Sequence, residues 1–160
     1  TLINAYNGWC FDGCMFIVKY DASGNVLWAK TANGASYASC VAIDASRNIY
    51  VAGSFSSDSI IFGSTTLHNA GRDDIFLVKY DTNGNVLWAK RAGGMGDAWT
   101  NSVAADALGN LYVTGGFDND SILFGSITLT NGMFIVKYDA NGIVLWAKSA
   151  GGGNITLSAR

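Results

Sequence analysis

The sequence predicts an all-β fold built from tandem copies of one four-stranded antiparallel unit. Three observations support this prediction: a threefold internal repeat, a composition poor in helix formers, and four short β-rich runs in each full repeat. The clearest repeat is FIVKYDASGNVLWAK at 16–30, which returns as FLVKYDTNGNVLWAK at 76–90 and as FIVKYDANGIVLWAK at 134–148. Its copies begin 60 and then 58 residues apart, and tandem supersecondary units commonly have periods of about this length.

The composition favours β structure and leaves enough apolar residues for a core. The chain has 160 residues, of which 49% are hydrophobic and 14% are charged. All 12 acidic residues are Asp, and the helix formers Glu and Gln are absent. A formal net charge of −2 gives no basic patch, so nucleic acid is not an expected partner. No apolar run approaches the roughly 20 residues of a membrane span.

Each unit contains two predicted hairpins and a short arm. The first hairpin is FLVKY at 76–80, the connector Asp81-Thr82-Asn83-Gly84, and VLWAK at 86–90. Asn and Gly tolerate positive φ and Asp bonds to its own turn, so this connector is a hairpin signal. The other elements come in two copies: strands at 41–44 and 49–53 recur at 103–106 and 111–115, and the arm at 60–67 recurs at 122–129.

Four strands in a repeated unit are typical of a propeller blade. Trp28, Trp88 and Trp146 fall on the fourth strand, where they suit the wide outer part of a blade. The repeated lysines are interpreted as charges that protect sheet edges and keep the surface soluble; they are Lys19, Lys79, Lys137, Lys30, Lys90 and Lys148.

Two segments resemble a known family. SVAADALGNLYVTG at 102–115 and MFIVKYDANGIVLWAKSAGG at 133–152 are similar to the bacterial seven-bladed, or SBBP-type, β-propeller repeat. The resemblance covers nearly the whole chain. It implies a β-propeller, usually in secreted or surface-anchored bacterial proteins and frequently with no catalytic assignment. The departure is size, because a seven-bladed ring needs far more chain than this.

The strand count predicts three blades, too few for an ordinary closed propeller, with one blade split between the two ends of the chain. Blade 1 is expected at 1–31 plus 154–159, blade 2 at 38–92 and blade 3 at 100–150 of a single domain. The missing strand of blade 1 comes either from the chain's own end or from a second copy. Copies joined head to tail give a ring or a filament. The alternative is a fragment of a longer propeller.

The leading hypothesis is therefore a non-enzymatic extracellular or cell-surface structural protein that assembles by terminal strand exchange. Leu2, Ile3 and Tyr6 are expected to line the acceptor blade, and Ile155 and Leu157 to anchor the donor strand. The chain begins at Thr1, which is typical of a processed mature form or an excised piece.

A binding module is the second hypothesis. Trp9, Phe11 and Trp99 lie outside the repeated pattern. Aromatic side chains on loops stack on sugar rings, so these three are candidate contacts for surface glycans in a carbohydrate-binding or adhesion module. They are equally suited to be partner contacts or loop anchors.

The cysteines form an odd set. Cys10, Cys14 and Cys40 allow one disulfide, with Cys10 and Cys14 clipping a short loop, plus one free thiol. Three reduced, partly buried thiols are the alternative.

No motif predicts a metal, a cofactor or catalysis. The Asp-x-Asn/Ser-Gly turns could suggest calcium, but they supply one or two acids each and no Glu, so they are interpreted as turn chemistry. The single histidine, His68, is expected on a surface loop, and no G-x-S-x-G nucleophile elbow occurs.

Overall fold

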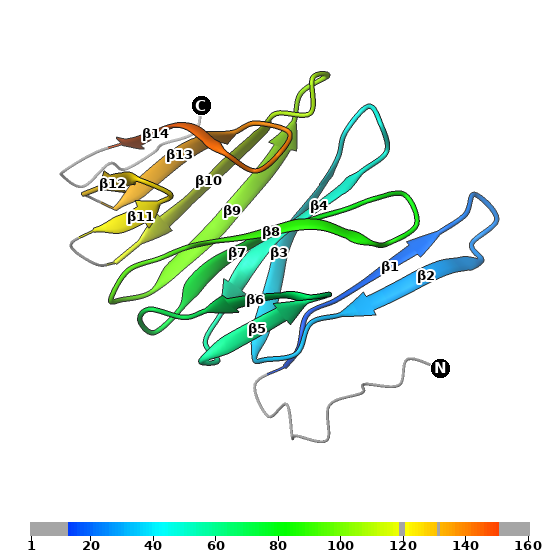
Figure 1. Cartoon of the computed structure of the whole chain (residues 1–160), viewed down its shortest axis with the longest axis horizontal. Helices are drawn as coiled ribbons and strands as arrows, with labels where there is room; N and C mark the ends of the chain where they lie inside the picture. The colour runs from blue at the N-terminus through cyan, green and yellow to red at the C-terminus, as the bar shows by residue number, and fades with distance from the viewer. Residues whose placement is uncertain (1–12, 119–120, 131, 151–160) are drawn as a thin grey trace, which may run out of the picture.

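The computed structural model describes residues 13–118, 121–130 and 132–150, and every regular element in these ranges is a β-strand (Figure 1). The predicted all-β fold is thus confirmed. The strands are β1 Phe16–Tyr20, β2 Val26–Thr31, β3 Ser36–Ile43, β4 Ile49–Phe55, β5 Ser59–Phe62, β6 Thr65–His68, β7 Asp74–Tyr80, β8 Val86–Ala92, β9 Ala98–Ala105, β10 Leu111–Phe117, β11 Ile122–Phe124, β12 Ile127–Leu129, β13 Met133–Tyr138 and β14 Val144–Ala150.

The strands form antiparallel sheets with one repeated topology. The four-stranded sheets have the orders β3-β4-β7-β8 and β9-β10-β13-β14, and β1 pairs with β2 in a separate two-stranded sheet. We call these the second, third and first unit, respectively. They lie side by side from the blue β1–β2 hairpin to the orange β13–β14 hairpin (Figure 1). The segments expected to complete the first unit, at 2–8 and 155–159, lie outside the described residues.

The first strand of each four-stranded sheet is longer than predicted. Strand β3 begins at Ser36 rather than at Val41, and β9 begins at Ala98 rather than at Val103. The extra residues are mostly small or polar, although Tyr37, Trp99 and Thr100 among them favour strands. Pairing with β4 extends β3 through a bulge between Ala38 and Cys40, so tertiary contacts set its length.

The hairpin connectors form the turns that the sequence predicts. The Asp81 carboxylate accepts hydrogen bonds from the backbone N–H groups of Asn83 and Asn85, both at 2.8 Å, and from the Asn85 side chain. These bonds, with the Asn85 side chain contributing most, hold the pKa of Asp81 below its ordinary value. Gly84 has a φ of +81°, where residues with a Cβ are disfavoured.

The β3–β4 turn has a residue other than glycine at its positive-φ position. Arg47 adopts a φ of +64°, at the position that Gly109 occupies with +78° in the β9–β10 turn. Among the residues that the structure describes, it is the one non-glycine with positive φ. Asn48 still donates from backbone and side chain to the Asp44 carboxylate, so the turn keeps its internal bonds.

The core lies between the units, because the middle strands are covered on both faces. Every residue of β7 is buried. Phe76, Val78 and Tyr80 pack toward the first unit, whereas Ile75 and Leu77 pack toward the third. Successive side chains of a strand point to opposite faces, so an apolar strand of this kind requires a neighbour on each side.

The predicted arms form two small hairpins, β5–β6 and β11–β12, and each links neighbouring units. Phe62 at the end of β5 packs on Phe76 with ring centroids 5.1 Å apart, and Phe124 packs on Phe134 at 4.7 Å. The backbone of Ile61 also bonds to Asn33, which follows β2 of the preceding unit.

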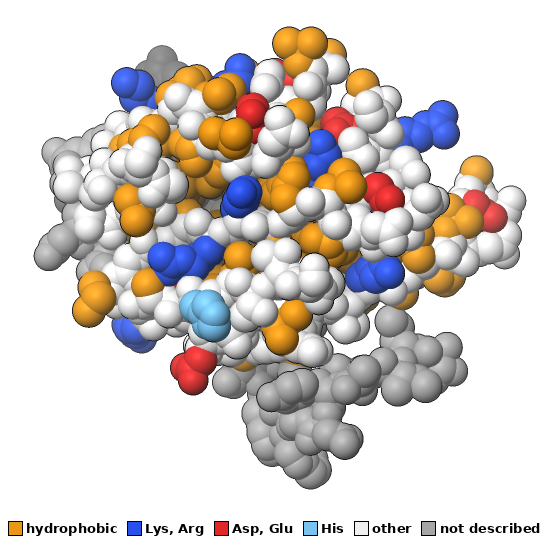
Figure 2. Space-filling view, viewed as in Figure 1, with side chains coloured by type: hydrophobic (Ala, Val, Ile, Leu, Met, Phe, Trp, Pro, Cys, Tyr) orange, Lys and Arg blue, Asp and Glu red, His pale blue; other side chains and the backbone are white. Residues whose placement is uncertain are grey.

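Charged side chains are scattered over the face seen in Figure 2, with no large patch of one sign. His68 is exposed there and ends strand β6, so its predicted exposure is confirmed and its predicted place in a loop is wrong. In the part of the chain that the structure describes, no helix combines the length and apolar character of a membrane span.

Candidate functional site

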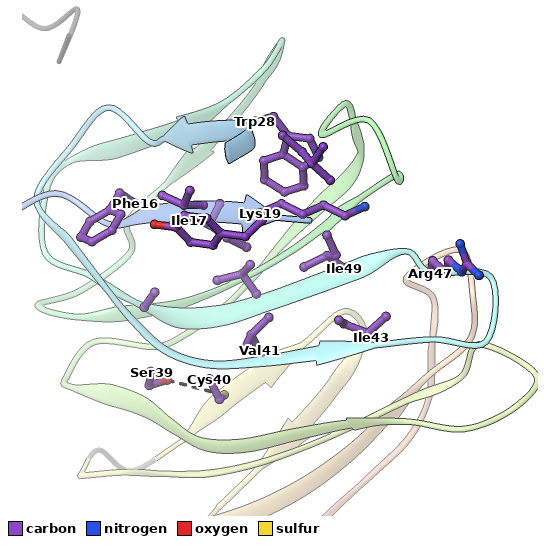
Figure 3. Close-up of a pocket in the computed structure, with 15 residues that line it drawn as sticks. Phe16, Ile17, Lys19, Trp28, Ser39, Cys40, Val41, Ile43, Arg47 and Ile49 are labelled. Atoms are coloured by element: carbon purple, nitrogen blue, oxygen red, sulfur yellow. Dashed lines mark hydrogen bonds between the residues drawn. The ribbon is translucent and has the colours of Figure 1, made fainter. Parts of the chain in front are cut away.

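An apolar groove lies between the first and second units. It has a volume of about 870 Å³ and is lined by β1, β2, β3 and β4. Phe16 and Trp28 border one side, and Val41, Ile43 and Ile49 border the other (Figure 3). We call this cavity the inner groove.

The inner groove occupies the place that inner strands take in the other units. Val41 is 59% exposed beside it, whereas Val103, at the equivalent position of the third unit, is 8% exposed beneath the second unit. Strand β7 pairs with β4 on one edge and β8 on the other, while β1 pairs only with β2 among the described strands. Phe16 is 63% exposed, whereas its counterpart Phe76 is fully buried against the unit that precedes it.

A second feature is a hydrogen-bonded contact between the first and second units. Trp28 Nε1 donates to the carbonyl oxygen of Thr82 at 3.1 Å, and Lys19 Nζ donates to the same oxygen at 2.8 Å. Thr82 lies in the β7–β8 turn, so a tryptophan and a lysine of one unit hold a backbone carbonyl of the next.

The same contact recurs between the second and third units. Trp88 Nε1 and Lys79 Nζ both lie 3.1 Å from the carbonyl oxygen of Ala140, in the β13–β14 turn. We call this arrangement the Lys–Trp interlock. It requires glycine at the turn, because a Cβ on Gly142 would approach the Trp88 ring to 3.0 Å.

Lys79 lies in a buried polar network. Its Nζ is 3.6 Å from Asp44 Oδ2 and 4.9 Å from the centre of the Tyr50 ring. The Tyr50 hydroxyl is 3.1 Å from the same Asp44 oxygen and 3.2 Å from the Gly109 carbonyl of the third unit. Lys79 is only 6% exposed, so the interpretation of this lysine as a surface charge is wrong.

Two ionisable groups of this network have shifted pKa values. Burial alone raises the pKa of the Asp44 carboxyl, but the hydrogen bonds from Asn48 and Tyr50 and the charge of Lys79 more than offset it, so the pKa lies below its ordinary value. Burial and the neighbouring Asp44 raise the pKa of the Tyr50 hydroxyl. Asp44 is therefore an anion and Tyr50 a neutral donor at neutral pH.

Most of the residues predicted from the sequence as assembly or ligand contacts lie outside the described residues. They are Leu2, Ile3, Tyr6, Trp9, Phe11, Ile155 and Leu157. Trp99 is described, but it lies in strand β9 rather than in a loop and is 43% exposed. Its ring covers Gly116, where an added Cβ would come within 2.6 Å of it.

The cysteines are only partly described. Cys14 is disulfide-bonded and Cys40 has a free thiol. Cys10, the predicted partner of Cys14, lies outside the described residues. Across residues 13–118, 121–130 and 132–150, no three His, Cys, Asp or Glu side chains are grouped to hold a metal ion.

Sequence reasoning identified the repeated Lys and Trp positions but not their role. Lys79 and Trp88 belong to one copy of the repeated string and Gly142 to the next copy, and only the packing of neighbouring units brings them together. The available signal was their joint recurrence at a fixed spacing. It indicated a structural role without indicating the acceptor, which is a backbone carbonyl.

Comparison with known proteins agrees with this architecture. Residues 87–115, from β8 to β10, match the family model described as Beta-propeller repeat. An uncharacterized WD repeat-containing protein of Acanthamoeba polyphaga mimivirus is 30% identical over 90% of this chain. The regulatory protein FlaEY of Caulobacter vibrioides is 28% identical over 65% of this chain.

The matches cover 12% and 11% of these two relatives, so the chain spans only a small part of their length. The family match, the repeated four-stranded sheets and the core between units agree with one another. We conclude that this chain is built from repeats of the β-propeller type.

Proposed function

We propose that this chain is a non-enzymatic, extracellular structural protein whose copies assemble head to tail by strand exchange. In this proposal the strand at 154–159 of one copy enters the inner groove of the next. Families of propeller and WD repeats are usually non-enzymatic scaffolds, which supports the general class.

The observation that supports strand exchange is the apolar, open inner groove. Val41 and Ile43 are 59% and 64% exposed there, and both project from one face of β3. Ile155 and Leu157 alternate with polar residues, so a strand at 154–159 presents both to one side. An added strand satisfies backbone hydrogen bonds and fills the apolar space in one step. Leu2, Ile3 and Tyr6 would line the same acceptor blade.

The extracellular location is supported by the disulfide at Cys14, because disulfides persist in oxidising compartments. Protease treatment of intact source cells checks this part of the proposal. A surface protein is digested while the cells stay closed, and an internal one is protected.

Strand exchange is tested by comparing two double variants of the full chain. Ile155→Asp with Leu157→Asp places charges on the apolar face of the proposed donor strand, and Thr156→Asp with Ser158→Asp places the same charges on the opposite face. We expect the wild-type protein and the second variant to form rings or filaments in electron micrographs, and the first variant to sediment as single copies. Assembly that survives the first variant, or a wild-type protein that sediments as a single copy, would contradict strand exchange.

A further inference from the structure

The third unit carries the donor half of a Lys–Trp interlock, that is, its lysine and its tryptophan, but no described turn carbonyl accepts their hydrogen bonds. Lys137 and Trp146 are the counterparts of Lys79 and Trp88, and Tyr112 is the counterpart of Tyr50. Lys137 Nζ lies 4.9 Å from the Tyr112 ring centre, the same distance that separates Lys79 from Tyr50. The Tyr112 and Trp146 rings are 6.2 Å apart, against 5.9 Å for Tyr50 and Trp88. The donor side chains are thus arranged alike in both units.

Lys137 is positively charged in this arrangement. A hydrogen bond with the Tyr112 hydroxyl, and to a lesser degree the charge of Asp106, raise the pKa of Lys137 above its ordinary value. Among the described residues, the side chains of Lys137 and Trp146 reach no turn carbonyl of the kind that Lys79 and Trp88 hold.

The first unit has the matching acceptor half. The β1–β2 turn has the same backbone as the two turns that are already held: the Gly24 N–H donates to the Asp21 carbonyl at 3.1 Å, as Gly84 does to Asp81 at 3.1 Å and Gly142 to Asp139 at 3.0 Å. The φ of Gly24 is +84°, against +81° and +75° for the other two glycines.

The acceptor turn is uncovered. A Cβ on Gly84 would meet the Trp28 ring at 2.9 Å, whereas a Cβ on Gly24 would meet no described residue within 4 Å. Tyr20, the residue before the turn, is 56% exposed, while its counterpart Tyr80 is 2% exposed and packs on Trp28 at 6.0 Å between centroids. The surface that a tryptophan of a preceding unit would cover is therefore open.

We propose that the third unit of one copy docks on the first unit of a second copy through a third Lys–Trp interlock. Lys137 Nζ and Trp146 Nε1 donate to the carbonyl of Ala22 in the second copy, and the Trp146 ring covers Gly24 and Tyr20. A second copy is the occupant that fits, because it presents the same turn backbone that the donor half already binds twice within the chain. The docking rests on the head-to-tail assembly proposed above and adds the contact that fixes its geometry.

This contact borders the inner groove, whose lining includes Tyr20, but it uses a different backbone element. The groove takes a strand against β1 and β3, whereas the interlock joins the β1–β2 turn to β13 and β14 of another copy. Two copies joined in both directions contribute six units, which is within the range of four to eight blades seen in closed propellers.

Two full-chain variants test the interlock. Gly24→Ala inserts a methyl group where the Trp146 ring of the other copy lies, and Lys137→Met removes the donor but keeps the side-chain length. We expect each to weaken self-association at least tenfold in sedimentation velocity, with unchanged circular dichroism. Gly13→Ala is the matched control, because Gly13 has a φ of +83° and, among the described residues, also has nothing within 4 Å of its Cβ. It bears the same backbone cost and leaves association unchanged.

The outcomes separate this inference from strand exchange. If the Ile155→Asp, Leu157→Asp variant dissociates while Gly24→Ala and Lys137→Met associate like wild type, the interlock is overturned and strand exchange stands. If the two interlock variants dissociate and the donor-strand variant does not, the interlock stands and strand exchange fails. A wild-type protein that never self-associates overturns both.

Discussion

Three glycines at equivalent turn positions, Gly24, Gly84 and Gly142, show how much one residue contributes to the packing of units. All three adopt positive φ, but only Gly84 and Gly142 are covered by an indole ring from the preceding unit. The absence of a Cβ thus serves two purposes at these two positions: it allows the turn conformation and lets the ring approach the backbone.

Gly84→Ala should cost more stability than Gly24→Ala. Both changes place an alanine at a positive φ, which costs about 1 kcal/mol, but only the change at Gly84 forces Trp28 away from the Thr82 carbonyl. We expect a total loss of about 2–3 kcal/mol in the free energy of unfolding for Gly84→Ala, because the displacement of the Trp28 ring and the loss of its hydrogen bond add to the backbone strain. Urea unfolding of dilute, non-associated protein measures the difference. Equal losses would show that the Trp28 contact contributes no stability.

At the scale of elements, the β5–β6 and β11–β12 arms explain how neighbouring units are held together at the rim. Each arm lies against its own sheet through a phenylalanine and bonds through its backbone to a residue that follows the previous unit's last strand. A small hairpin is marginal by itself, so the arm owes its stability to these two attachments.

Phe62→Ala should destabilise the protein by about 3–5 kcal/mol, because it empties a fully buried site against Phe76. Ile61→Ala is the matched change on the other face of β5. Ile61 is 38% exposed and its link to Asn33 is made by the backbone, so we expect a loss of about 1 kcal/mol. Thermal and urea unfolding give both values, and similar losses would contradict the role of Phe62.

The hairpins were predictable from the sequence because their signals are local. The Asp81 turn and the alternating apolar residues of β7 and β8 specify one hairpin without help from the rest of the chain. The start of β3 was not predictable, because Ser36–Ala38 is held by pairing with β4 across a bulge. The interlock was hidden for a similar reason: the acceptor of Lys79 is a carbonyl 61 residues away, which no local pattern encodes.

At the scale of the whole molecule, the chain has a closed core between its units and open surfaces at its first unit. Its inner groove measures about 870 Å³ and is apolar, and Tyr20 and Gly24 are uncovered nearby. Covering apolar surface of this kind stabilises the folded chain. Because association then stabilises the folded state, folding and association are coupled by mass action.

The thermal midpoint of the wild-type protein should therefore rise with protein concentration. A tenfold increase above the dissociation constant adds about 1.4 kcal/mol, which corresponds to roughly 3–6 °C for a chain of this size. The variant with Ile155→Asp and Leu157→Asp should melt at a constant, lower temperature. Scanning calorimetry at three concentrations checks this, and a constant midpoint for the wild-type chain would rule out assembly that stabilises the fold.

The interlock has a further consequence for how such chains grow. Its acceptor is a main-chain carbonyl, supplied by Thr82 in one turn and by Ala140 in the other, so the contact does not depend on which side chain stands there. A duplicated unit would arrive with both halves of the contact already present, whatever substitutions its turn had gathered at that position. The number of units is therefore free to change by gene duplication or loss, while each boundary between units keeps the same construction.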